Sequence, residues 1–318
     1  MTSGSLFARA AAMPGVGYLL AALLVTFTAF DPRFASVPNL LNIGTQSSTL
    51  LLLALPMTLV IMSEGLDLSM GAVLGLSGVV LAMRLASGGG LITALVLAVA
   101  VGIAFGVANG LLVVRLGIPP FVTTLGTLYI AQGVALVLTD GRSVVGIGSA
   151  LPALYASTWL GLPFSIAVSA MIYVVFHFVL YRTPFGVYVF AIGGNRESLV
   201  LAGVRANLYH VGLYAIGGAM AGFAALLFTA RTNAGHPTAA MGLEFDAIAA
   251  VIVGGTSFER GNGWLPGTLL GVLTVGVLKN GLNVMEVHNA LQVASIGLLV
   301  IVALLIDSVR GESIRGRA

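Results

Sequence analysis

Ten long stretches of the chain carry no Asp, Glu, Lys or Arg, and charged positions lie between them. An α-helix rises about 1.5 Å per residue, so ~20 apolar residues cross the ~30 Å hydrocarbon core of a bilayer. The pattern predicts an all-α polytopic membrane protein with about ten transmembrane helices, some broken or short, in one domain over residues 1–318. The stretches are Ala10–Phe30, Phe34–Ser63, Leu68–Met83, Leu85–Val114, Leu116–Thr139, Ser143–Tyr181, Ala206–Ala230, Ala247–Phe258, Gly261–Leu278 and Val287–Ile306.

Three of these stretches do not have the length of one crossing. In Ser143–Tyr181, Pro152 and the polar segment Ser157–Gly161 indicate a loop or short helix before a single span over Leu162–Leu180. Leu68–Met83 would reach ~24 Å, and Ala247–Phe258 is too short to cross alone. The last two are therefore predicted to be broken helices, or to be flanked by acidic residues that face a wet cavity.

The first stretch, Ala10–Phe30, follows Arg9 and has the general layout of a secretory signal. It is longer than a signal core and meets no convincing small-x-small cleavage site. We expect it to be a retained first span.

Composition supports a bilayer as the main solvent. Hydrophobic residues make up 58% of the chain and charged residues 8%, against about 25% charged in soluble domains. The chain has no cysteine, which excludes disulfides and Cys-based metal or redox chemistry.

The basic residues predict an orientation. With a cytoplasmic N-terminus and ten spans, nine basic residues lie inside and five outside, which satisfies the positive-inside rule. Both termini are then cytoplasmic, and residues 182–206 form the largest cytoplasmic loop. The inside set is Arg9, Arg115, Arg182, Arg196, Arg205, Arg260, Arg310, Arg315 and Arg317, and the outside set is Arg33, Arg84, Arg142, Arg231 and Lys279.

That loop contains the segment "AIGGNRESLVLAGVR", which is unusually polar for this chain. Asn195 is a good helix N-cap, Glu197 suits the first turn, and Gly203 can end the helix. The predicted helix has about seven residues and a length of ~10 Å, so it cannot cross the membrane. It is either a connector lying on the bilayer or, together with the preceding Gly193–Gly194, a small element that docks into a partner.

Six segments resemble one protein family in order and spacing, from Pro38 to Asp307. They are "PNLLNI", "LVIMSEGLDLSMG", "NGLLVVRLGIPPFVTTLGTLYI", "YRTPFGVYVFAIGGNRESLVLAGV", "GLEFDAIAAVIVGGTSFERGNGWLPGTLLG" and "LKNGLN". These segments are similar to those of the ribose/simple-sugar permeases of ABC transporters. In that group, the tract ending in GxN-x-x-x-A/L-x-x-x-G forms the helix that couples the permease to its ATPase.

The resemblance implies a multi-pass permease of the bacterial inner membrane, which imports a monosaccharide or similar polyol. Its implied partners are ABC ATPase subunits that carry ATP and Mg²⁺, a second permease copy or paralogue, a periplasmic or lipid-anchored sugar-binding protein, and membrane lipid, with no nucleic acid. The Gly254–Gly263 loop would add to the ATPase contact. The implied coupling residues are Gly194, Asn195, Arg196, Glu197, Ser198, Leu199 and Gly203.

The chain departs from the family at two places, and both add charge. Glu64 replaces the first glycine of the usual Gly-Gly-Ile-Asp-Leu-Ser, and Glu259 and Arg260 interrupt a glycine-rich Gly-Gly-Thr-Ser loop.

Several kinds of active site are absent from the sequence. There is no Gly-x-x-x-x-Gly-Lys phosphate loop and no Gly-x-Ser-x-Gly elbow, so we expect neither an enzyme nor a cofactor on this chain. The four histidines lack i, i+4 pairing, so we expect no metal site. We expect His177 and His210 to find backbone or interfacial partners.

Polar residues within or beside apolar stretches, together with Phe121 in one of the family-like segments, are candidates for a translocation pathway. Asp67 and Asp246 face an alternative, which is that each caps the helix that follows it. Thr123 and Thr124 follow two prolines and are also suited to accommodating freed helix carbonyls. The candidate set is Asp67, Ser69, Asn109, Phe121, Thr123, Thr124 and Asp246.

The broken, acid-flanked segments also fit another class of protein, a secondary transporter driven by H⁺ or Na⁺. This alternative needs no ATPase, and the polar loop would then be a simple connector.

Overall fold

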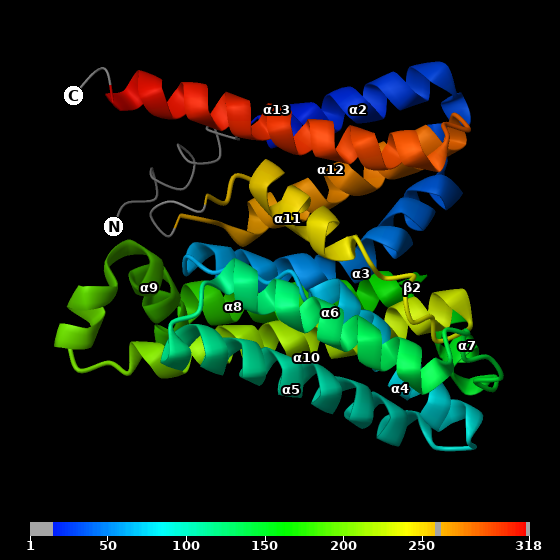
Figure 1. The fold of residues 1–318 in the computed structure, drawn as a ribbon. Helices are drawn as coiled ribbons and strands as arrows, with labels where there is room; N and C mark the ends of the chain where they lie inside the picture. The colour runs from blue at the N-terminus through cyan, green and yellow to red at the C-terminus, as the bar shows by residue number, and fades with distance from the viewer. Residues whose placement is uncertain (1–14, 258–261, 316–318) are drawn as a thin grey trace. The chain divides into compact units, whose positions relative to one another are not determined.

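The computed structural model describes residues 15–257 and 262–315, and almost every element in them is helical (Figure 1). The all-α prediction is confirmed, with one very short hairpin added. The elements are α2 (Val16–Phe30), η1 (Pro32–Ala35), α3 (Val37–Met62), α4 (Met70–Ala86), α5 (Leu91–Leu116), α6 (Pro120–Thr139), α7 (Ala150–Ala156), β1 (Thr158–Trp159), β2 (Leu162–Pro163), α8 (Phe164–Arg182), α9 (Pro184–Leu201), α10 (Ala206–Thr232), α11 (Leu243–Val253), α12 (Leu265–Val284) and α13 (Asn289–Arg315).

In the described residues, nine of the ten apolar stretches each overlap mainly one α-helix, and Ser143–Tyr181 contains two, α7 and α8. Within that part of the chain, six helices are long and apolar enough to cross a membrane, namely α3, α5, α6, α8, α10 and α12. Shorter apolar helices are α2, α4 and residues 290–302 of α13, and α11 has 11 residues. The protein is thus an all-α polytopic membrane protein.

The longest stretch, Ser143–Tyr181, folds as predicted. Its first part forms α7 and the β1–β2 hairpin, in which Thr158 pairs with Pro163, and a single long helix, α8, follows. Because a proline and a polar segment interrupt the apolar run, only α8 is available as a span.

The chain divides into two compact units. Unit 1 contains residues 1–47, 249–256 and 264–318, and unit 2 contains residues 48–248 and 257–263. In unit 1, α12 packs on α2, and Phe27 lies against Gly281 in a cluster with Phe34, Ile43 and Val277.

Unit 2 is built around α4. Most side chains of α4 are buried, and α5, α6 and α10 contact it. A helix that is apolar all round lies either in a protein core or in a membrane, and α4 is covered by other helices. The other elements of unit 2 therefore surround α4 and leave little of its surface exposed.

The tightest contact in unit 2 joins α5 and α10, which run side by side in Figure 1. Small residues recur every four positions along α5, so they share one face; they are Ala94, Ala98, Gly102, Gly106 and Gly110. Gly218 and Gly222 of α10 meet this face, and a Cβ on Gly218 would collide with the backbone oxygen of Gly102. Such small-residue faces let helix backbones approach closely in lipid, where apolar burial gives no driving force.

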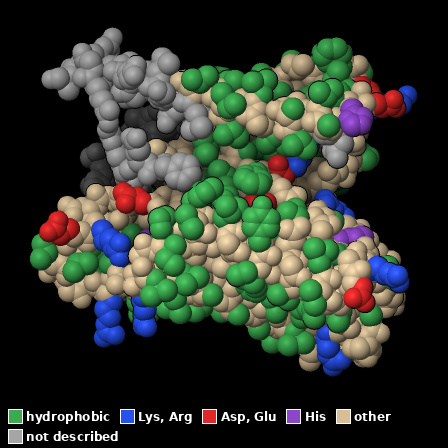
Figure 2. Space-filling model, in the orientation of Figure 1, with side chains coloured by type: hydrophobic (Ala, Val, Ile, Leu, Met, Phe, Trp, Pro, Cys, Tyr) green, Lys and Arg blue, Asp and Glu red, His purple; other side chains and the backbone are tan. Residues whose placement is uncertain are grey.

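The outward faces of α5, α6 and α8 are apolar. Over these helices, Figure 2 shows hydrophobic and uncharged side chains, with the charged ones gathered toward the helix ends. Examples are Ile92 on α5, Val137 on α6 and Val174 on α8, which are 78%, 79% and 64% exposed. Water would disfavour such a surface, and hydrocarbon suits it.

We predict that Gly218→Ala destabilises the protein by about 1–3 kcal/mol, because the added methyl group meets backbone that cannot move aside. The measurement is the midpoint of thermal unfolding in mild detergent.

Gly212→Ala is the matched control, since Gly212 lies on the same helix and a Cβ there meets nothing within 4 Å. The control should leave stability unchanged or raise it by up to ~1 kcal/mol through helix propensity. Equal effects of the two substitutions would contradict backbone packing between α5 and α10.

Candidate functional sites

The polar loop forms a short capped helix at one end of unit 2 (Figure 1). Helix α9 is interrupted at Asn195, whose φ of −158° and ψ of 82° are not helical. The Asn195 side-chain oxygen accepts a hydrogen bond from the Ser198 backbone N–H at 2.9 Å. The predicted N-cap is confirmed, and a new helical segment begins after it.

The same segment ends at Gly203, as predicted. Gly203 has φ +79°, which favours glycine, and its N–H donates to the Val200 oxygen at 2.9 Å. The Val204 N–H donates to the Leu199 oxygen at 3.2 Å, and the Leu199 and Val204 side chains belong to one apolar cluster. This pair of bonds with its apolar contact is a Schellman motif.

Residues 195–203, the knob, have one buried and one exposed side. Leu199 packs with Ile192 and Ala206, whereas Leu201 is 81% exposed. Arg196 and Glu197 are also exposed. The knob is thus fixed to unit 2 by its inner side and presents an apolar tip flanked by charges.

The sequence did not predict the first part of α9. Residues 184–194 are helical, so Gly193 and Gly194, which were expected to precede the cap, are the last residues of a helix that ends there. Gly186 permits this helix, because a Cβ there would collide with the Leu180 backbone oxygen.

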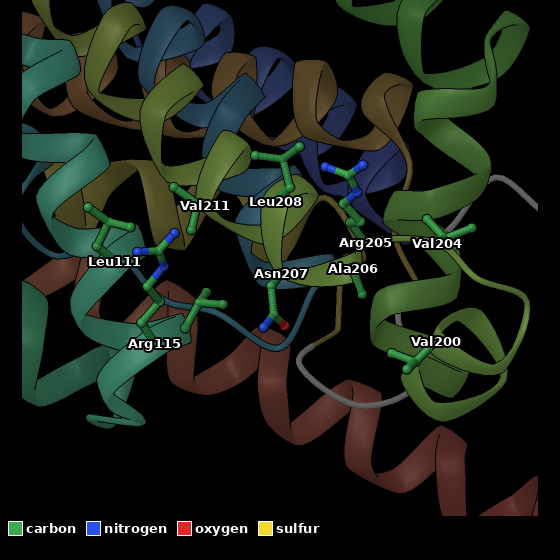
Figure 3. Close-up of a pocket in the computed structure, with 10 residues that line it drawn as sticks. Leu111, Arg115, Val200, Val204, Arg205, Ala206, Asn207, Leu208 and Val211 are labelled. Carbon is green, nitrogen blue, oxygen red and sulfur yellow. The ribbon is translucent and has the colours of Figure 1, made fainter.

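A groove of about 510 Å³ lies beside the knob (Figure 3). Figure 3 shows Leu111 and Arg115 of α5 on one side, Val200 and Val204 on the other, and Asn207 between them. The Arg196 guanidinium donates to the Asn207 side-chain oxygen at 2.6 Å, which ties the knob to the start of α10. The lining residues are Leu111, Val114, Arg115, Val200, Val204, Arg205, Ala206, Asn207, Leu208 and Val211.

The second candidate site is a buried polar cluster where α4 begins. The Ser69 backbone N–H and hydroxyl donate to one Asp67 carboxylate oxygen at 2.9 and 2.6 Å, and the Asn109 amide donates to the Ser69 hydroxyl at 2.8 Å. All three side chains are at most 1% exposed. The structure therefore brings together three of the predicted pathway residues. The N-cap position of α4 is Ser69, and Asp67 does not occupy it but accepts the Ser69 N–H in the turn before the helix.

Two residues of α10, His210 and Tyr214, extend this cluster and were not among the predicted pathway residues. The Tyr214 hydroxyl lies near Gly65, where a Cβ would come within 2.8 Å of it, and the His210 ring stacks on Tyr214 at 5.8 Å. Among the described residues, the Tyr214 hydroxyl and both His210 ring nitrogens are buried with no hydrogen-bond partner. A backbone partner for His210 is therefore not found within residues 15–257 and 262–315. The four-residue spacing of these polar side chains within an apolar helix was the available signal.

Glu64, which stands where the family usually has glycine, has a left-handed backbone conformation. Its φ is +61°, a conformation that costs a non-glycine residue about 1–2 kcal/mol, and its side chain is exposed. Backbone geometry alone suits this position to glycine. Because the Glu64 side chain is exposed, it adds charge at the surface of the turn and not within the buried cluster.

Glu244 supplies a second acidic group near the start of α4. Its carboxylate lies against Gly71, where any Cβ would collide with it, and it accepts the Gly242 N–H at 3.1 Å. Because α11 begins at Leu243, both Glu244 and Asp246 lie in its first turn. The interpretation that Asp246 caps the start of the helix was wrong, because α11 already begins at Leu243 and Asp246 lies within its first turn.

The three predicted pathway residues of α6 differ in how far they are exposed. Phe121 is 54% exposed, whereas Thr123 and Thr124 are buried. The Thr124 hydroxyl donates to the Pro120 oxygen at 2.9 Å, as expected for a residue that satisfies a freed carbonyl. The Thr123 hydroxyl has no partner among the described residues.

The described residues contain no group of three His, Cys, Asp or Glu side chains suited to a metal ion. Glu259 and Arg260, which interrupt the Gly254–Gly263 loop, lie outside the described residues, as do Arg9 and Arg317.

Comparison with known proteins places these features in a family. A family profile described as "Branched-chain amino acid transport system / permease component" matches residues 39–304. The ribose import permease protein of Bacillus subtilis (strain 168) is 36% identical over 287 residues, 90% of this chain and 89% of that protein. The D-allose transport system permease protein of Escherichia coli (strain K12) is 35% identical over 295 residues, 92% and 90% of the two chains.

The L-arabinose transport system permease protein of Escherichia coli (strain K12) is 28% identical over 301 residues, 95% of this chain and 92% of that protein. No solved structure matches the chain. The resemblance to simple-sugar permeases, which the six segments suggested, is confirmed along nearly the whole chain, and the relatives are transporter subunits, not enzymes. The chain belongs to the family of branched-chain amino acid transport system permease components.

Proposed function

We propose that this chain is the transmembrane permease subunit of an ABC importer that translocates a monosaccharide or similar polyol. The relatives named above are a ribose import permease and the permeases of a D-allose and an L-arabinose transport system. A solute-binding protein, periplasmic or lipid-anchored, would deliver the sugar, and separate ATPase subunits would bind ATP and Mg²⁺.

The observation that carries the coupling role is the knob. It is capped at both ends and fixed by Leu199, and it exposes Leu201. A connector that only rests on a bilayer does not require this rigidity. A rigid knob with an apolar tip transmits the motion of an ATPase cleft to α10 through Val204 and Ala206, which lie in the same apolar cluster.

The two compact units would act as one permease domain, with residues 182–206 as its cytoplasmic coupling loop. The chain would lie in the bacterial inner membrane with both termini cytoplasmic, beside a second copy or a paralogue. Ten membrane segments would include α11, whose 11 residues reach only ~17 Å. The chain next to α11 must then be covered by protein or line a polar cavity.

The buried polar cluster is the proposed part of the translocation pathway. Asp67, Ser69 and Asn109 offer carboxylate, hydroxyl and amide groups, which can exchange hydrogen bonds with sugar hydroxyls. Side chains that form weak, replaceable hydrogen bonds with a solute suit a site that must also release that solute. Thr123 and Asp246 would contribute from α6 and α11, and the exposed Phe121 would flank them.

An ion-driven secondary transporter remains the alternative class, and the family match does not support it. The buried acids at the start of α4 have a structural role in both classes, so they do not favour ion coupling.

We predict that Leu201→Asp lowers sugar uptake while the protein still reaches the membrane, because a charge at the apolar tip opposes docking. Losing a central apolar anchor typically costs about 2 kcal/mol, roughly thirtyfold in affinity. The measurement is uptake of radiolabelled ribose, allose and arabinose in cells that contain the complete importer.

The matched control is Leu160→Asp, which places the same charge on a fully exposed leucine of the β1–β2 hairpin. Uptake should be unchanged in the control. Normal uptake by Leu201→Asp, or an equal loss in both variants, would contradict a docking role for the knob.

We predict that Asp67→Asn lowers uptake about tenfold, equivalent to ~1.4 kcal/mol, but leaves the unfolding midpoint nearly unchanged. The asparagine oxygen can still accept both bonds from Ser69, so the turn keeps these bonds while the charge is lost. Uptake and thermal unfolding would be measured on the same variant. A loss of membrane protein that fully accounts for the loss of uptake would leave Asp67 with a structural role alone.

A further inference from the structure

The groove beside the knob has features that docking of an ATPase does not explain. It is lined mainly by aliphatic side chains from the end of α5, the start of α10 and the knob. Its volume of about 510 Å³ lies within the ~300–1,000 Å³ range of small-molecule sites. Leu111 and Leu208, on its two helical walls, are 36% and 64% exposed, so the groove opens to the surroundings.

The charged residues of the groove are all cations. Arg115 and Arg205 line it, and no Asp or Glu is among its lining residues. Neither guanidinium has a hydrogen bond or ion pair with the part of the chain that the structure describes. The Asn207 oxygen already accepts from Arg196, so its remaining amide group is a donor, which adds to the preference for an anion.

The position of the groove along its two helices indicates where it lies relative to the membrane. Its α5 residues lie in the last two turns of that span, and its α10 residues, 206–211, cover only ~8 Å of helix at the start of the other span. Both helices are long and apolar enough to cross the membrane. The groove therefore lies at the boundary between hydrocarbon and headgroups.

We propose that this groove binds an anionic phospholipid. The phosphate would lie near Arg115 and Arg205, and an acyl chain would follow Leu111, Leu208 and Val211. Basic pockets between transmembrane helices bind anionic headgroups in this way. Aliphatic walls at bilayer depth suit a lipid chain better than a soluble partner, whose contacts fall on the exposed tip of the knob.

Such a lipid would contact α5, α10 and the knob together, because Val200 of the knob also lines the groove. The inference requires only that the chain spans a membrane, and it does not rest on the proposed cargo or ATPase.

The test uses the purified full-length chain in mixed micelles of dodecyl maltoside with palmitoyl-oleoyl phosphatidylglycerol or phosphatidylcholine. Native mass spectrometry counts the bound lipid after detergent is stripped. We expect phosphatidylglycerol to be retained in preference to phosphatidylcholine, and each of Arg115→Gln and Arg205→Gln to weaken its retention about fivefold. Leu208→Gln, which keeps the charges but adds a polar group to the wall, should also weaken it.

The control is Arg142→Gln, which removes an exposed arginine that does not line the groove. Equal losses in Arg115→Gln and Arg142→Gln would show attraction to net charge alone and overturn the proposal. Displacement of the lipid by millimolar glycerol phosphate with no effect of Leu208→Gln would assign the site to a soluble phosphate. Unchanged lipid retention in both groove arginine variants, with loss of ATPase binding, would assign the groove to the ATPase.

Discussion

The arrangement of unit 2 depends on one constraint, which is that helix α4 begins in the buried interior of the unit. A helix end leaves backbone N–H groups without intrahelical partners, and burial makes each unmet donor costly. Asp67 meets this requirement at the turn and Glu244 places a second carboxylate against Gly71, where the helix dipole favours negative charge. The buried acids, the glycine that admits one of them and the linked Asn109 all follow from this constraint. These groups are polar and buried inside unit 2, which is why they are the proposed part of the translocation pathway.

The neighbours of α4 are held by shape. Since apolar burial drives little association between helices in lipid, α5 and α10 rely on the close approach that their small residues permit. Helix α10 therefore has two roles. Its middle packs on α5 and carries Tyr214 into the polar cluster, and its first turn packs under the knob through Ala206. A displacement of the knob would reach the polar cluster along one continuous helix, and two discrete arrangements of that helix would suffice for alternating access.

Much of this organisation could be predicted from the sequence because its signals are local. Charge-free runs located the helices, the proline and polar residues within Ser143–Tyr181 separated α7 from α8, and Asn195 and Gly203 marked both ends of the knob. The remainder depends on contacts between distant residues. The meeting of Glu244 with Gly71 and the approach of the Tyr214 hydroxyl to Gly65 leave no local pattern. Gly193 is helical although glycine has a low intrinsic helix propensity. The number of membrane crossings also depends on how short helices such as α11 are covered, which composition does not reveal.

The central claim is that the knob is the contact through which an ATPase drives this permease. The most direct measurement is affinity purification of the tagged chain from mild detergent, with mass spectrometry of the proteins that accompany it. An ABC ATPase subunit should co-purify with the wild-type chain and be lost with Gly203→Pro, which cannot adopt the φ of +79° or donate to Val200. The variant must remain folded in the membrane for the comparison. A chain that purifies without an ATPase and still accumulates sugar in proteoliposomes under an ion gradient would contradict the account.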